Sequence, residues 1–264
     1  MNIAISTGTF YKVPFYKVLE LIKKAGFEYI ELLQHWQGGS NWEVAQHLKR
    51  ISPKETLKLI RESGLKISSL HDGGGVIEEG KESVVAKSTY EFLEFGNDEI
   101  PCIVFHVPHK KTNDKSWANV YRSFAGKCLN TFKNQIICIE NMPEFNGYET
   151  ISSEPYDLLK FTTEYDIYIN FDSTHYAQMD INIVDAAQIL RDRVRTVHLS
   201  DYKNPNTHVY PGEGDLNLSG MLKQLNKNAL HAITIECSIE YNEKETAKTI
   251  DRLKKVLCYV KHII

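Results

Sequence analysis

Short apolar segments of strand-like composition alternate with longer segments of helical hydrophobic spacing along the whole sequence, in about eight repeats. Because the strand segments are apolar on both faces, we expect them in a parallel sheet that helices cover. Eight repeats favour closure into a (β/α)8 barrel, an α/β fold of about 250 residues. The chain has 264 residues and no composition break, so we predict a single domain over residues 1–264.

Local signals mark where several of the helices begin and end. A helix predicted over residues 14–25 is followed by Gly26, and one predicted over residues 53–63 lies between Ser52 and Gly64. Serine before proline is a common helix start, and glycine is a common helix stop. Further helices are predicted near residues 116–132, 154–165, 183–190, 218–225 and 242–260.

Six predicted strands end on a residue that can bind a divalent cation. Alone, each such residue is more often a salt bridge or a satisfied polar group than a ligand. In a parallel barrel, however, the carboxyl ends of the strands surround one active site, so these side chains should converge. The six residues are His71, His106, Glu140, Asp172, His198 and Glu236.

Three carboxylates and one imidazole close four successive strands in the second half of the chain. Hard oxygen ligands with one nitrogen suit Mn²⁺ or Zn²⁺, and they also accept Co²⁺ or Mg²⁺. We therefore predict a divalent metal site at these strand ends. Its ligands are Glu140, Asp172, His198 and Glu236.

Four further histidines near the strand ends form a second candidate set, for another metal ion or for the substrate. They are His71, His106, His175 and His208. Two alternatives stay open, because His175 can be a loop residue that caps the next segment and His208 can be an ordinary surface residue. Phe10 and Trp36 follow early strands and are candidates for an apolar wall that binds substrate, although core packing explains Phe10 equally well.

Composition excludes several other classes of protein. The five cysteines are odd in number and widely spaced, which argues against a disulfide framework and fits a reducing cytoplasm. We find neither a secretion signal nor an apolar run of membrane-spanning length. A formal net charge of -3 gives no general attraction to nucleic acid, so we expect a small-molecule substrate. The sequence leaves the oligomeric state open and allows a homo-oligomer.

Five short motifs carry a resemblance to a known family, and it extends over essentially the whole chain. They are IEN at 139–141, DSTH at 172–175, HLSD at 198–201, PGEGD at 211–215 and ITIE at 233–236. With these motifs the sequence resembles the xylose isomerase-like TIM barrel superfamily. That superfamily includes sugar isomerases and epimerases, hydroxypyruvate isomerase, inosose dehydratase and the endonuclease IV group.

The sugar epimerases of that superfamily suggest an activity. The resemblance implies that the four strand-end residues bind one metal ion and that Glu140 and Glu236 also act as the catalytic acid and base. One carboxylate would remove a proton next to a metal-bound carbonyl, and the resulting enediolate would be reprotonated. We therefore expect an isomerase or epimerase of a small sugar or polyhydroxy carbonyl compound. Several of these epimerases carry an arginine where this chain has Asn204.

The endonuclease IV group suggests an alternative, a zinc-dependent phosphodiester hydrolase with up to three ions. In that group the four outer histidines, together with an aspartate, complete the additional zinc sites. This chain has Asn206 at the aspartate position, and an amide is a much weaker zinc ligand. A related dehydratase is a further alternative, since the same proton abstraction can expel a hydroxyl group. A barrel that only binds a ligand is less expected, because the metal-ligand positions are intact.

Overall fold

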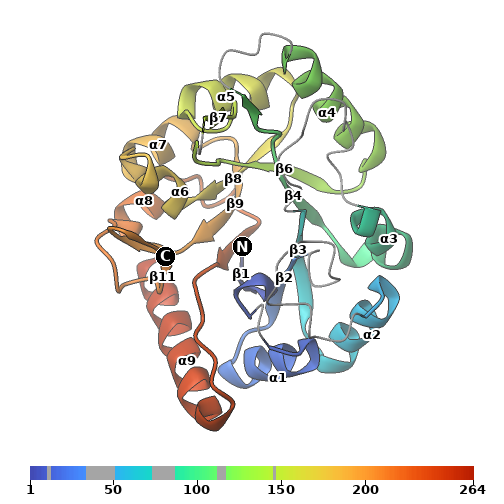
Figure 1. Cartoon of the computed structure of the whole chain (residues 1–264), viewed down its shortest axis with the longest axis vertical. Helices are drawn as coiled ribbons and strands as arrows, with labels where there is room; N and C mark the ends of the chain where they lie inside the picture. Colours follow the sequence, from blue (N-terminus) through green and yellow to red (C-terminus); the bar gives the residue numbers. More distant parts are fainter. Residues whose placement is uncertain (11–12, 34–50, 73–86, 112–116, 145–146) are drawn as a thin grey trace.

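Eight parallel strands form a closed barrel in the computed structural model, which describes residues 1–10, 13–33, 51–72, 87–111, 117–144 and 147–264 (Figure 1). Neighbours in the barrel follow one another along the chain, and the last strand pairs with the first. This is the predicted (β/α)8 fold. The barrel strands are β1 (Asn2–Ser6), β2 (Tyr29–Leu33), β3 (Lys66–Asp72), β4 (Cys102–His106), β6 (Ile136–Glu140), β8 (Tyr168–Asp172), β9 (Val194–Leu199) and β12 (Ala232–Ile235).

Helices surround the barrel and bury its outer face (Figure 1). The predicted boundaries are confirmed where local signals marked them: Gly26 and Gly64 end their helices in the left-handed conformation, and the Ser52 hydroxyl accepts a hydrogen bond from the Glu55 amide. The helices are α1 (Phe15–Ala25), α2 (Pro53–Ser63), α3 (Lys87–Gly96), α4 (Trp117–Thr131), α5 (Pro155–Glu164), α6 (Ser173–Gln178), α7 (Ile183–Leu190), α8 (Leu218–Gln224) and α9 (Thr246–Ile263).

Several short elements were not predicted from the sequence. Helix α6 begins directly after β8, and three 3₁₀ turns occupy Thr7–Phe10, Asn97–Glu99 and Glu243–Glu245. Two antiparallel pairs lie outside the barrel: β5 (Lys110–Lys111) with β7 (Tyr148–Glu149), and β10 (Asp201–Lys203) with β11 (Asn206–Val209). Elements of two to six residues are too short to produce a periodic apolar pattern.

Alternation along the strands separates an apolar shell from a polar interior. Isoleucine, leucine, valine and phenylalanine side chains of the strands pack with the helices in one hydrophobic cluster. The intervening positions are buried as well, but toward the carboxyl ends they become polar, as with Asn170 and Asp172 in β8 and with Thr196 and His198 in β9. Since residues two apart share a face of a strand, each of these pairs lies on one face.

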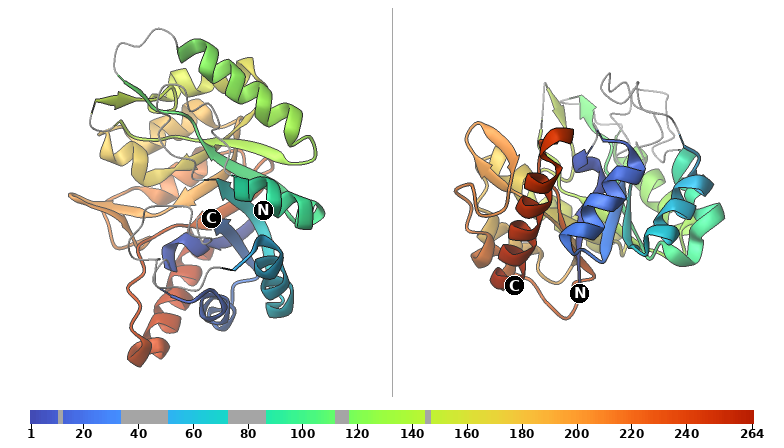
Figure 2. Two further views of the ribbon diagram at one scale, coloured as in Figure 1. Left: turned by 45° about the vertical axis from the view of Figure 1, so that its right-hand side comes forward. Right: turned by 90° about the horizontal axis from the view of Figure 1, so that it is seen from below.

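The carboxyl ends of the strands form the end of the barrel opposite the chain termini. In the right-hand view of Figure 2, the N-terminus that begins β1 and the C-terminus that ends α9 lie at the same end. The loops that follow the strands therefore build the other end, where barrels of this class carry their chemistry. Among the described residues, none of the helices combines the length and apolar composition needed to span a lipid bilayer.

Candidate metal centre

Four strand ends bring the predicted metal ligands together. One ligand atom from each of the four residues lies within 4.8 Å of the others. Three of these side chains are 0–1% exposed, and the fourth, Glu236, follows β12 and keeps 19% of its side chain exposed toward the barrel mouth. The group comprises Glu140, Asp172, His198 and Glu236.

Backbone contacts fix Asp172 at the end of β8. The amide of Asp172 donates to Asn141 Oδ1 at 2.7 Å, and Asn141 Nδ2 donates to the Asp172 carbonyl at 3.0 Å. Asp172 is also the N-cap of α6, because its Oδ1 accepts from the His175 amide at 2.8 Å. The second oxygen, Oδ2, is buried without a hydrogen-bond partner and lies 3.9 Å from His198 Nδ1. The IEN and DSTH motifs thus orient one carboxylate oxygen into the centre.

His198 lies in the middle of the group and uses its two ring nitrogens differently. Its Nδ1 lies 2.8 Å from Glu236 Oε2 and 3.3 Å from Glu140 Oε2. Its Nε2 points the other way and lies 3.0 Å from the carboxylate of Glu31. Only one nitrogen of a neutral imidazole carries a proton, so a proton on Nε2 leaves the Nδ1 lone pair directed at the centre.

The donor atoms fit a divalent cation. Both oxygens of Glu140, Oδ2 of Asp172 and Nδ1 of His198 are fully buried without a hydrogen-bond partner, although polar atoms at such depth are normally paired. All four atoms are lone-pair donors when the imidazole is protonated on its other nitrogen. A cation shared between them would satisfy every one.

Two of the outer histidines flank Glu140. His71 is the penultimate residue of β3 and His106 is the last residue of β4. Their Nε2 atoms lie 2.9 Å apart. Each also approaches Glu140 Oε2, at 3.2 Å for His71 and 3.5 Å for His106. These three residues form a second group that could hold an ion. Glu140 belongs to both groups and can bridge them.

The other two outer histidines, His175 and His208, lie beside Asp172. His175 is in α6, where its Nδ1 lies 2.9 Å from the Asn141 carbonyl and 3.2 Å from Glu140 Oε1. His208 lies in β11 with a φ of 49°, and its ring centroid is 5.4 Å from that of His175. Together with Asp172 they form a third candidate group. His175 also belongs to the helix that Asp172 caps, so the capping and ligand interpretations coexist.

The carboxylates of the centre attract positive charge. Burial opposes the charged form of His198, but Glu236, Glu31 and Glu140 outweigh it and raise its pKa well above the usual value. Burial likewise opposes ionisation of Glu236, yet His198 and His71 lower its pKa to about 2. Glu140 and Glu236 are therefore carboxylates at neutral pH, and their charges attract either protons on the imidazoles or a divalent cation.

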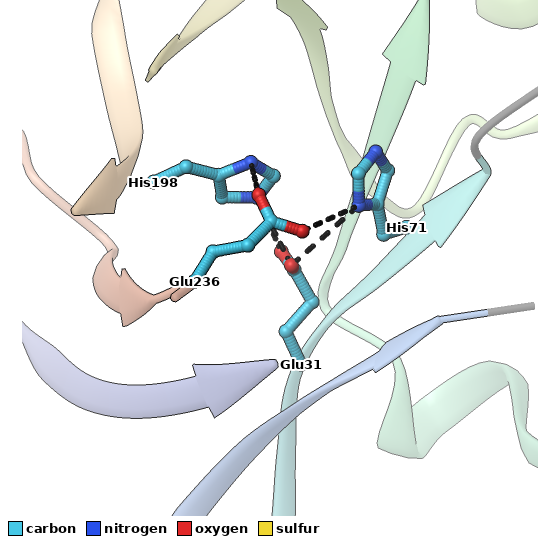
Figure 3. A group of neighbouring side chains, drawn as sticks. All are labelled: Glu31, His71, His198 and Glu236. Atoms are coloured by element: carbon cyan, nitrogen blue, oxygen red, sulfur yellow. Dashed lines mark hydrogen bonds and ion pairs between the residues drawn. The ribbon is translucent and has the colours of Figure 1, made fainter. Parts of the chain in front are cut away.

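Glu31 is a part of the centre that the sequence analysis missed. It occupies the middle of β2, between Ile30 and Leu32, and it is fully buried. Figure 3 shows its carboxylate below the imidazoles of His198 and His71 and next to the carboxylate of Glu236. The signal in the sequence was a charged residue inside an apolar strand, whereas only strand ends were considered.

The predicted apolar wall for substrate receives no support from Phe10. This ring is 1% exposed and packs in the hydrophobic core directly after β1, so it has almost no surface to offer a ligand. Core packing, the alternative interpretation, agrees with that position. Trp36 lies outside the described residues.

The HLSD and PGEGD motifs form one loop structure beside the centre. The Asp201 carboxylate accepts hydrogen bonds from the amides of Tyr202, Gly212 and Leu216, at 2.9–3.0 Å. A Cβ at Gly214 would lie 2.6 Å from Asp201 Cγ, so only glycine fits there. The glycines therefore serve the packing of this loop. A polar groove of about 590 Å³ borders it and is lined in part by His208.

Comparison with known proteins identifies the family. The model of the xylose isomerase-like TIM barrel family matches residues 19–256, and the chain belongs to this family. No curated protein matches the sequence.

Solved structures share the fold at low sequence identity. An L-ribulose 3-epimerase superposes with a TM-score of 0.73 at 14% identity, over 99% of this chain and 94% of that one. A D-allulose 3-epimerase from Methylomonas sp. gives 0.71 at 16% identity, over 100% and 97%. The probable 3-DHS dehydratase AsbF from Bacillus anthracis gives 0.70 at 18% identity, over 98% and 99%.

Proposed function

We propose that this protein is a divalent-metal-dependent isomerase or epimerase of a small sugar or polyhydroxy carbonyl compound. The observation that carries the proposal is the group formed by Glu140, Asp172, His198 and Glu236, in which the first three have lone-pair donors that are buried without hydrogen-bond partners. Two structural neighbours, an L-ribulose 3-epimerase and a D-allulose 3-epimerase, agree with this reaction class.

Glu140 and Glu236 are the proposed acid and base. Their carboxylates come from β6 and from the end of β12, and both approach His198 Nδ1, at 3.3 and 2.8 Å. One carboxylate removes the C–H proton beside a carbonyl, and the other returns a proton to the resulting enediolate. Return to the same carbon from the other face gives epimerisation, and return to the adjacent carbon gives isomerisation.

Other residues in the centre bind and orient. Asp172 and His198 complete the metal-ligand set, with Mn²⁺ or Zn²⁺ as the first candidates and Co²⁺ or Mg²⁺ as further ones. When bound, a divalent cation polarises a substrate carbonyl and makes the neighbouring C–H proton easier to remove. His208 lines the groove beside the centre, and the ring centroid of His175 lies 5.4 Å from that of His208; both are candidates for contacts with substrate hydroxyl groups.

The test is proton exchange at carbon. The protein is loaded with each of the four cations in D₂O and incubated with a panel of ketoses, and deuterium incorporation is read by mass spectrometry. We expect exchange with at least one sugar and its loss in Glu236→Gln and Glu140→Gln. Glu94→Gln, which changes an exposed carboxylate of α3 outside the candidate metal groups and the groove, is the matched control and should keep full activity. Metal-loaded protein that exchanges no sugar would contradict the proposal.

A zinc-dependent phosphodiester hydrolase is the second candidate, and one specific observation favours it. Besides the main group, three further groups could each hold an ion, and each shares a carboxylate with the main group. One of them comprises Glu31, His71, His198 and Glu236. Clustered zinc ions can generate hydroxide and stabilise a leaving oxygen. Native mass spectrometry that finds three zinc ions, together with nicking of an abasic-site duplex, would favour this function. One ion per chain and no nicking would leave the isomerase.

A related dehydratase would use the same first step, since removal of a proton beside a carbonyl can expel a β-hydroxyl group. The description of one structural neighbour as a probable 3-DHS dehydratase agrees with this chemistry. The exchange experiment separates the two, because a dehydratase product is lighter than its substrate by one water and an isomerase product is not.

A further inference from the structure

Glu31 reaches the centre because of an irregularity between β2 and β3. Ile30 pairs with Ile67, but the next pair is Glu31 with Ser69, so Ser68 is an extra residue on β3. The Ser68 hydroxyl donates to the Ile30 carbonyl at 2.9 Å and satisfies one group that the bulge disturbs. Bulges of this kind redirect side chains and are common beside active sites. Here the bulge places Ser69 directly beside Glu31.

The Glu31 carboxylate contacts two imidazoles from different strands. Its Oε2 accepts from the Ser69 hydroxyl at 2.8 Å and lies 3.0 Å from His198 Nε2. Its Oε1 lies 3.7 Å from His71 Nδ1, and both of these atoms are buried without a hydrogen-bond partner. Figure 3 shows the carboxylate placed between the two rings. In the described part of the chain, the basic groups that it contacts are imidazoles rather than lysine or arginine, and the carboxylate of Glu236 lies nearby.

Each imidazole turns its other nitrogen toward the candidate metal ligands. For His198 that nitrogen is Nδ1, which faces Glu236 and Glu140, and for His71 it is Nε2, which lies 3.2 Å from Glu140 Oε2. The two rings thus use opposite nitrogens, yet both direct the remaining one at the same carboxylate. A neutral imidazole that donates its only N–H to a carboxylate has its other lone pair free for a metal.

We propose that Glu31 is the positioning residue of the centre: it accepts the Nε2–H of His198 and so keeps the Nδ1 of that ring available to a cation. In this arrangement one buried carboxylate orients the histidine of the main group, and its charge lies 3.7 Å from the Nδ1 of His71 in the group with His106. The inference rests on the proposed metal centre and deepens it. Ser69 supports it by holding the carboxylate between the rings.

The experiment compares metal affinity and imidazole tautomers in matched variants. Glu31→Gln keeps the size of the side chain and removes its charge. We expect cation affinity, measured by calorimetry with Zn²⁺ or Mn²⁺, to fall about 10–100-fold, the usual effect of removing such a partner. Asp72→Asn is the control, because Asp72 is an equally buried carboxylate next to His71 that accepts from the Thr89 hydroxyl at 2.8 Å. It should leave the affinity unchanged.

Nitrogen-15 spectra of the histidine rings give a readout that a merely structural role would not move. In the metal-loaded wild-type protein we expect His198 as the Nε2–H tautomer. Glu31→Gln should lose this fixed assignment, while Asp72→Asn should keep it. If Glu31→Gln does not fold, Ser69→Ala, which releases the carboxylate, should show the same change with a smaller loss of affinity.

The outcomes separate this inference from the proposed function. Unchanged affinity and tautomers in Glu31→Gln would overturn the role of Glu31 even if the metal centre is real, as would an equal loss of affinity in the Asp72→Asn control. A wild-type protein that binds none of the cations would refute the proposed function. In that case the Nε2–H resonance of His198, which a hydrogen bond to Glu31 shifts, still decides whether Glu31 holds this ring: it should move in Glu31→Gln and stay in Asp72→Asn.

Discussion

Replacing Asn141 with alanine should both destabilise the fold and weaken the metal centre. The Asn141 side chain is fully buried and links β6 to β8 through two hydrogen bonds, to the amide of Asp172 at 2.7 Å and to its carbonyl at 3.0 Å. Alanine would leave the Asp172 amide buried and unpaired and would remove one hydrogen bond from the Asp172 carbonyl, which is also the N-cap carbonyl of α6. At about 1–3 kcal/mol for the unsatisfied amide and about 1 kcal/mol for the lost bond to the carbonyl, we expect a loss of about 2–4 kcal/mol in the free energy of unfolding.

The assay is urea unfolding in the presence of a chelator, so that only the metal-free protein is compared. Asn182→Ala is the matched control, because its side chain also accepts from a backbone amide, at 2.9 Å, but as the exposed N-cap of α7. The loss of a helix cap costs about 1 kcal/mol. The metal affinity of Asn141→Ala should also fall by roughly tenfold, since Asp172 would lose the contacts that hold it. The reasoning is refuted if Asn141→Ala costs no more than Asn182→Ala.

Three further results are expected. Burial lowers the pKa of His109 from 6.5 to about 4, so its stabilising effect is present above pH 6.5 and is lost as the pH falls toward 4. Between pH 7 and 5 the free energy of unfolding should fall by about 2 kcal/mol relative to His109→Gln, as measured by chemical unfolding. Gly214→Ala should destabilise the protein by about 1–3 kcal/mol, because the new Cβ clashes with Asp201. Gly126→Ala, in open space within α4, should stabilise the protein by about 0.5–1 kcal/mol, and thermal melts will compare the two variants. Burial opposes protonation of His175, but Asp172 and Glu140 raise its pKa to about 9. Metal binding should therefore release protons, and the metal affinity should weaken as the pH is lowered from 9 to 6. Calorimetry in several buffers will detect both effects.

The barrel could be predicted because its signal repeats along the whole chain. Eight strands with apolar outer faces and helices with clear stops, such as Gly26 and Gly64, each carry their own local pattern. The short elements carry none: α6 has six residues, and β5 pairs with β7 across nearly forty positions of the sequence. Pairing at that distance depends on how the loops pack, which a local pattern does not contain.

The candidate ligands could be predicted for a geometric reason. A residue at the end of a parallel barrel strand can only lie at one end of the barrel, so Glu140, Asp172 and His198 had to approach one another once the fold was known. Their finer arrangement depended on contacts that no spacing reveals. Asn141 selects which oxygen of Asp172 faces the centre, and the extra residue Ser68 in β3 brings Glu31 under it.

Charge explains why the one missed residue matters to the others. The candidate groups, with Glu31 included, contain four carboxylates and five imidazoles. If all of the imidazoles are neutral, the combined charge of these groups is strongly negative. Protons alone can compensate by charging His198 and His175, but a protonated Nδ1 on His198 cannot also bind a cation. Glu31 resolves this competition by drawing the His198 proton to Nε2. An isomerase centre with one cation and a hydrolase centre with three cations would differ in how many of the remaining negative charges are balanced by metal. The number of ions bound per chain therefore also shows whether the outer histidines act as metal ligands.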